Sequence, residues 1–90
     1  MTRDEAIANY RAKRAEWMRL GDLADATFKR YFLKLQNGTP TNGAACARMD
    51  ARVNFASADL YSAQGFLYKL DIDPWTIDDE DGVEHTPVGS

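Results

Sequence analysis

Few side chains in this chain have the types and spacing that catalysis needs. The one histidine, His85, stands beside Glu84 in a loop-like stretch, where we expect a solvated side chain. The one cysteine, Cys46, lies on an apolar stripe, where a small hydrophobic residue is more typical than a nucleophile. Acid–base and nucleophilic catalysis need a reactive group with a partner within reach. We therefore predict a binding protein and not an enzyme.

The acidic residues near the C-terminus do not have the spacing of a metal site. A calcium loop that began at Asp71 would place Trp75 and Thr76 at its fifth and sixth positions, where an oxygen ligand and a glycine are needed. One cysteine and one histidine do not make a zinc site. The two Asn-Gly dipeptides are isolated and do not form a phosphate-binding loop. We expect neither a metal nor a cofactor.

Charge is distributed unevenly along the chain. Residues 1–36 hold eight Lys/Arg and five Asp/Glu, whereas residues 37–90 hold three Lys/Arg and nine Asp/Glu. Direct nucleic-acid binding is not expected from a chain with a net charge of −3, because phosphate affinity needs a concentrated basic surface. The first five residues lack the apolar core of a signal peptide, no apolar stretch reaches membrane-spanning length, and one cysteine cannot form an internal disulfide. We expect a cytoplasmic protein.

One candidate ligand site combines arginines with an aromatic ring. Arg48 and Arg52 are one helical turn apart, and Phe55 follows on the same face, while Lys29 and Arg30 come from the preceding helix. A planar ring beside forked guanidinium donors suits an anionic, aromatic ligand such as a nucleotide. Alternatively, the arginines pair with acids of their own helix or of the tail.

A second candidate surface lies in the acidic tail. Trp75 could insert into a groove of a host protein partner while Asp78, Asp79, Glu80 and Asp81 meet a basic surface or mimic the charge of DNA. Alternatively, Trp75 folds back on the helices and the acids keep the protein in solution. A third set of cations, in the first helix, is interleaved with Tyr10 and Trp17, and there we expect a solvated face with both rings in the core.

The spacing of apolar residues predicts helices up to Leu70. Thr2 and Glu5 form a capping box at the start of the first helix, which Gly21 can end. A second helix would then run to Asn37-Gly38, although Gly21 need not break the backbone, so the two could be one kinked helix. The Gly, Pro and Asn residues of 37–43 predict a turn before the third helix.

The third helix carries two stripes on opposite sides. The larger side chains recur at spacings of three and four at Cys46, Met49, Val53, Ala56, Leu60, Ala63, Leu67 and Leu70. The other stripe is mostly small, at Ala44, Ala47, Ala51, Asn54, Ala58, Tyr61, Gly65 and Tyr68. We expect the larger stripe to face the second helix in a hairpin. The small stripe would be covered by the first helix or by a second copy of the chain, which predicts a homo-oligomer in the latter case.

These elements predict an all-α fold, a helical hairpin with an additional N-terminal helix and an acidic irregular C-terminal tail. Pro74 disfavours helical geometry at Asp73, so we expect the helix to stop there. The organisation would be a helical domain at residues 1–70 and a tail at residues 71–90.

Part of the third helix resembles a known family. Thr39-Pro40, the triplet Arg48-Met49-Asp50 and the run from Phe55 to Leu60 are similar to the helical-hairpin domain of phage anti-CBASS and anti-Thoeris proteins, which sequester nucleotide signals. The resemblance covers about a quarter of the chain. Ser57 stands where the family prefers Asn, and the glutamate after the turn is absent. It implies a phage-encoded, non-enzymatic oligomer that holds a cyclic nucleotide between subunits, in the cytoplasm of the host cell.

Three functions from different classes follow. The first is an anti-defence protein that sequesters a cyclic nucleotide. The second is a protein–protein inhibitor of the anti-CRISPR or DNA-mimic type that acts through the acidic tail. The third is a small helical structural or adaptor protein.

Overall fold

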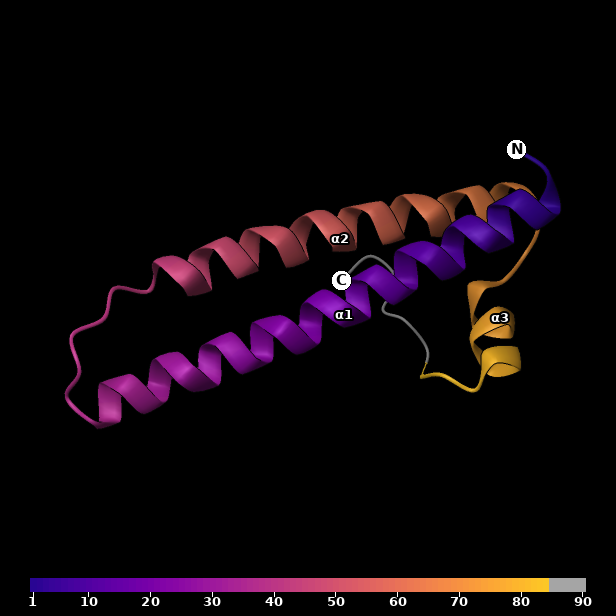
Figure 1. The fold of residues 1–90 in the computed structure, drawn as a ribbon. Helices are drawn as coiled ribbons and strands as arrows, with labels where there is room; N and C mark the ends of the chain where they lie inside the picture. The colour runs from indigo at the N-terminus through magenta and orange to yellow at the C-terminus, as the bar shows by residue number, and fades with distance from the viewer. Residues whose placement is uncertain (85–90) are drawn as a thin grey trace.

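The computed structural model describes residues 1–84, and these residues form three helices. Helices α1 (Arg3–Gln36) and α2 (Ala44–Lys69) run antiparallel as a long hairpin, and α3 (Pro74–Asp81) lies beside the end of the hairpin that holds the N-terminus (Figure 1). The molecule is elongated, with extents of 53 × 22 × 18 Å. The predicted all-α hairpin is confirmed. Over the described part of the chain, no helix is both long and apolar enough to cross a membrane.

Helix α1 is continuous through Gly21, so the single-helix alternative is correct. Its start is fixed as predicted, because the Glu5 amide donates to Thr2 Oγ1 over 3.2 Å and the Thr2 amide donates to Glu5 Oε1 over 3.1 Å. A glycine inside a helix costs about 1 kcal/mol relative to alanine, which a helix packed along its length tolerates. The N-terminal helix of the prediction is therefore the first half of α1.

The turn and the start of α2 follow from local hydrogen bonds. Gly38 has a φ of +70°, a left-handed conformation that favours glycine, just after α1 ends. Asn42 Oδ1 accepts a hydrogen bond from the Ala44 amide over 3.2 Å at the start of α2. The chain thus reverses within residues 37–43, which makes the two long helices neighbours.

The hydrophobic core sits at the α3 end of the hairpin. The larger stripe of α2 faces α1, as predicted, and its residues Cys46, Ala56, Leu60, Ala63 and Leu67 are buried. Leu60, Ala63 and Leu67 join residues of α1 and the tail in one cluster, which also contains Ala6, Tyr10, Ile72 and Ile77. Nearer the turn only Leu20, Ala24 and Cys46 are buried among the apolar side chains. The turn end of the hairpin is therefore less completely packed and leaves room between the helices.

The small stripe of α2 is exposed. Ala47, Ala51 and Ala58 are solvent-accessible on the side of α2 that faces away from α1. Because α1 is one helix packed on the opposite stripe, the first helix does not cover this side. The predicted cover by the first helix is therefore not what the structure shows, and cover by a second copy stays a prediction.

The sequence predicted an irregular tail after Leu70, but Pro74–Asp81 form the helix α3. Asp73 Oδ1 accepts a hydrogen bond from the Trp75 amide over 3.0 Å, and Pro74 occupies the first turn, so the residues that stop α2 also begin α3. Gly82, with a φ of +68°, ends the helix. Ile72 and Ile77 belong to the main core, so this core extends past the boundary predicted at residue 70.

Candidate anion-binding site

A cleft of about 520 Å³ lies between α1 and α2 near the turn. Figure 1 shows the two helices separating towards this end. The cleft is lined by Thr27, Arg30, Tyr31, Lys34, Thr41, Asn42, Ala44, Ala45, Cys46, Arg48, Met49 and Arg52. Four of these side chains are cationic and none is acidic. The lining is therefore suited to an anion.

The four cations form two pairs on opposite walls. Arg30 and Lys34 are one turn apart on α1, and Arg48 and Arg52 are one turn apart on α2. Within residues 1–84, none of the four forms an ion pair; the Arg52 guanidinium lies 3.9 Å from the Met49 sulfur. Unpaired cations that share a concave surface reinforce one another's positive potential.

The alternative in which these arginines pair with nearby acids is not what the structure shows. The Asp59 carboxylate oxygen Oδ2 lies 4.0 Å from the ammonium nitrogen of Lys13 on α1. The tail acids also bond to α1, at Arg11 and Arg14. Asp59 and these tail acids are thus engaged with α1 outside the cleft. Glu16 of α1 bonds to Arg19, and the Arg52 charge is near enough to help lower the pKa of Glu16.

An aromatic side chain, Tyr31, completes the cleft. Its ring packs edge-on against Phe32 with centroids 5.6 Å apart. Thr27 donates its hydroxyl hydrogen to the Leu23 carbonyl over 2.8 Å and so remains an acceptor towards the cleft. The cleft therefore combines guanidinium and ammonium donors with a phenol ring. Cys46 also lines it but is buried, as expected for a small apolar residue.

The structure brings together three of the five ligand residues predicted from the sequence. Arg30, Arg48 and Arg52 line the cleft. Lys29 does not, and its ammonium lies 3.0 Å from an Asp25 carboxylate oxygen on the same helix. Phe55 also lies elsewhere, 77% exposed on the outer side of α2.

Among the charged and aromatic residues of the cleft, Lys34 and Tyr31 were not predicted from the sequence. Lys34 follows Arg30 by one turn, which is the same spacing as that of Arg48 and Arg52. Tyr31 stands next to Phe32 in an apolar part of the same helix, where the sequence gives no sign of a ligand contact. The spacing of Lys34 was a usable signal, whereas the position of Tyr31 depends on how far the two helices separate.

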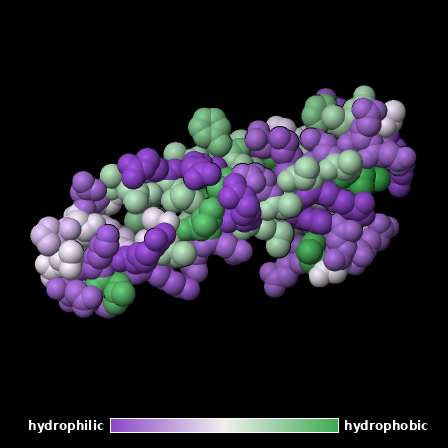
Figure 2. Space-filling view, in the orientation of Figure 1, coloured by the Kyte–Doolittle hydropathy of each residue, from purple (hydrophilic) through white to green (hydrophobic). Residues whose placement is uncertain are grey.

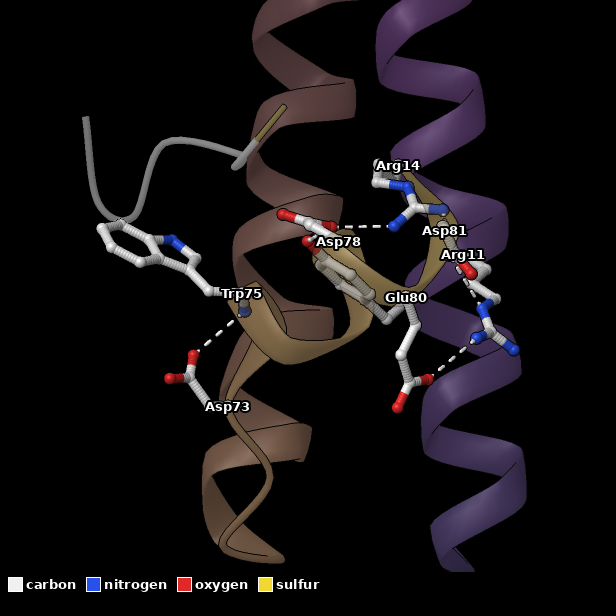
Figure 3. Close-up of polar contacts among 8 residues, drawn as sticks. Arg11, Arg14, Asp73, Trp75, Asp78, Glu80 and Asp81 are labelled. Atoms are coloured by element: carbon white, nitrogen blue, oxygen red, sulfur yellow. Dashed lines mark hydrogen bonds and ion pairs between the residues drawn. The ribbon is translucent and has the colours of Figure 1, made fainter. Parts of the chain in front are cut away.

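The tail acids form a second polar cluster, which binds α3 to α1 (Figure 3). Asp78 is fully buried, and its Oδ1 accepts hydrogen bonds from the Tyr10 hydroxyl and from Arg14 Nη1, each over 2.8 Å. Asp81 accepts from Arg14 Nη2 and, over 3.0 Å, from Arg11 Nε. Arg14, which interrupts the apolar stripe of α1, is thus buried between two carboxylates.

These bonds shift the ionisation of both partners. Burial of Arg14 opposes its charge, but hydrogen bonds from its guanidinium to Asp81 and Asp78 outweigh this and raise the pKa of Arg14. Hydrogen bonds from Arg14 and then Arg11 lower the pKa of Asp81. The bond between Arg14 and Asp81 therefore favours the charged form of both side chains.

The predicted partner-binding tail is largely engaged by the chain's own residues. Asp78 and Asp81 contact Arg14, and Glu80 lies 3.8 Å from Arg11. Trp75 is about half exposed and points away from this cluster (Figure 3). The alternative of a back-folded Trp75 with solvated acids also differs from this arrangement, because these three acids contact α1. His85 and the rest of the tail lie outside the described residues.

Comparison of the chain with family models, with curated proteins and with solved structures finds no match. Over residues 1–84, no group of three or more His, Cys, Asp or Glu side chains is placed to hold a metal ion.

Proposed function

We propose that this protein binds a small anionic ligand with two phosphate groups in the cleft between α1 and α2, without transforming it. The observation that carries the proposal is the pair of facing cation pairs, Arg30 with Lys34 and Arg48 with Arg52, in a lining without an acid. Each pair can donate charge-assisted hydrogen bonds to one phosphate.

The size and chemistry of the cleft favour a nucleotide within that class. Its volume of about 520 Å³ falls in the usual range for small-molecule sites. The Tyr31 ring offers an aromatic surface for a base, and Asn42 offers amide groups for hydrogen bonds to base edges. The resemblance of residues 48–60 to phage anti-defence proteins remains a prediction, and it makes cyclic nucleotides the first ligands to test. Sequestration of such a signal is the biological role that we propose.

Other functions have less support from the described residues. A polymeric nucleic acid would meet the acids of α3 at the other end of an acidic molecule. A DNA-mimic inhibitor needs its carboxylates exposed, whereas Asp78 is buried and Asp81 is held by two arginines. An adaptor function would use the exposed side of α2.

Calorimetric titration with cyclic mono-, di- and trinucleotides tests the proposal, with pyrophosphate as a probe of the charge alone. We expect Arg48→Ala to weaken binding at least 10-fold, because a hydrogen bond to a charged group contributes about 1.5–3 kcal/mol. Lys29→Ala is the matched control: it removes a cation of α1 that lies outside the cleft, and affinity should change less than 2-fold. Chromatography of the ligand after incubation should recover it intact.

Two results would overturn the proposal. One is the absence of heat for every ligand with tens of micromolar protein. The other is an equal loss of affinity in the Arg48 and Lys29 variants, which would indicate attraction by overall charge and no site in the cleft.

A further inference from the structure

The side of α2 that faces away from α1 is an unpartnered apolar surface. We call it the outer face and define it by Ala47, Ala51, Asn54, Phe55, Ala58 and Tyr61. Phe55 is 77% exposed and Tyr61 is 57% exposed. Ala51, Asn54, Phe55 and Ala58 line a shallow groove of about 380 Å³. Figure 2 shows a hydrophobic side chain projecting from the upper edge of the molecule over α2. An aligned row of apolar side chains on one helix face differs from the isolated ones that most surfaces carry.

We propose that two copies of this chain pair antiparallel through the outer face. This inference does not rest on the proposed ligand, although the pairing uses Arg52, which also lines the cleft. Its geometry follows from the position of Phe55 and the groove, which lie together at the middle of α2 (Ala44–Lys69). A two-fold axis between residues 55 and 56 sets the Phe55 ring of each copy against the groove of the other. Such an interface is self-complementary, as two-fold symmetry requires, and the alanines permit close approach of the helices.

The surface of the chain is large enough for such an interface. The accessible area is 6157 Å² for a 10.1 kDa chain. A compact monomer of that mass has about 5,300 Å². The excess of roughly 900 Å² is similar to the ~800 Å² that each partner buries in an interface of standard size. The elongated hairpin exposes more surface than a compact chain of the same mass, which leaves room for an interface of standard size.

An antiparallel pair is complementary in charge. Arg52 and Asp59 lie two turns apart on the same flank of α2, equally far from the proposed axis. Antiparallel pairing therefore places Arg52 of each copy opposite Asp59 of the other. On the other flank, Asp50 and Tyr61 are also equidistant from the axis. The Tyr61 hydroxyl of each copy therefore lies opposite the Asp50 carboxylate of the other copy. The contact of Asp59 with Lys13, at 4.0 Å between exposed side chains, is too weak to prevent this.

The same pairing also engages one residue of the cleft. Arg52 would then be shared between the interface and the cleft, while Arg30, Lys34 and Arg48 remain available to the ligand.

Sedimentation equilibrium of the full chain at 10–100 μM tests the surface. We expect the wild type to have twice the 10.1 kDa chain mass. Ala58→Glu should give the monomer mass with unchanged helicity by circular dichroism, because it places two carboxylates at the interface. Ala26→Glu is the matched control, at another exposed helical alanine, on α1, and should remain dimeric. A monomeric wild type at 100 μM overturns the proposal, and so does a dimeric Ala58→Glu variant.

The direction of pairing is tested by distances between spin labels. The labels are attached at Ala47→Cys in a Cys46→Ala background. With the proposed axis, residue 47 lies opposite residue 64 of the other copy, so the two labels are about 26 Å apart along the helices at about 1.5 Å per residue. Parallel pairing would bring them to about 10 Å, the spacing of packed helices. A distance peak near 10 Å would overturn the antiparallel arrangement.

Discussion

Replacing Asp78 with alanine removes the carboxylate that joins α3 to α1. Asp78 is fully buried and accepts hydrogen bonds from the Tyr10 hydroxyl and the Arg14 guanidinium, each over 2.8 Å. In the variant, the Arg14 side chain stays buried and keeps only its bond to Asp81 at the edge of the cluster. The substitution therefore leaves a buried cation that is only partly compensated.

The expected loss of stability is large for a chain of this length. Removing one partner of a buried ion pair costs about 3–5 kcal/mol. Because Asp81 still offers Arg14 a carboxylate, we expect about 3 kcal/mol, at the low end of that range. A 90-residue domain has roughly 5–13 kcal/mol of unfolding free energy in total. The midpoint of thermal unfolding should fall by about 12–24 °C.

Urea unfolding followed by far-ultraviolet circular dichroism measures this loss. Glu80→Ala is the matched control on the same helix, since its contact with Arg11 is exposed and 3.8 Å long, and it should change stability by less than about 0.5 kcal/mol. The double variant Arg14→Met/Asp78→Leu should recover most of the loss, because it leaves no buried charge. If Asp78→Ala costs less than about 1 kcal/mol, the polar cluster does not hold α3 and the reasoning fails.

Two further perturbations test the electrostatics and the core. The lowered pKa of Asp81 means that its folded-state pKa lies below its unfolded value of about 4, so its contribution to stability is present above pH 4 and is lost as the pH falls through the folded pKa. Urea midpoints measured from pH 7 to pH 2 should therefore drop most steeply below pH 4, and a flat profile there would contradict the ion pairing. Leu67→Ala in the fully buried core should cost about 2–5 kcal/mol in the same urea assay, whereas Leu33→Ala, at an exposed position of α1, should cost less than about 0.5 kcal/mol; similar losses would mean that the core is misplaced.

The long helices could be predicted from the sequence because their signals are local. The capping box of Thr2 and Glu5 involves residues three apart, and it forms as expected. The apolar residues of the larger stripe of α2 recur every three or four residues, so they lie on one face of the helix. That face is the one that a packing partner is expected to bury. The pair Arg48 and Arg52 lies one turn apart on any helix. Each of these predictions needed only the geometry of one helix.

The short helix and the buried ion pair could not be predicted in that way. Arg14 sits within an apolar stripe of α1, and its carboxylate partners, Asp78 and Asp81, are 64 and 67 residues away. Taken alone, the acids after Pro74 have the composition of a solvated tail. They fold back because a buried guanidinium needs an anion and because Ile77 completes the core.

The sequence by itself determined that the segments of the two long helices are helical, which stripe of α2 is buried and which cations share a helical turn, since all of these follow from the helical repeat. Only the tertiary structure decided that two cation pairs from different helices face one cleft, that Lys29 and Phe55 lie outside it, and that the tail acids bond to α1. These outcomes depend on where the two helices separate and on which charges are buried. Both are properties of the packed chain, because charge burial and helix separation are set by contacts between residues far apart in sequence.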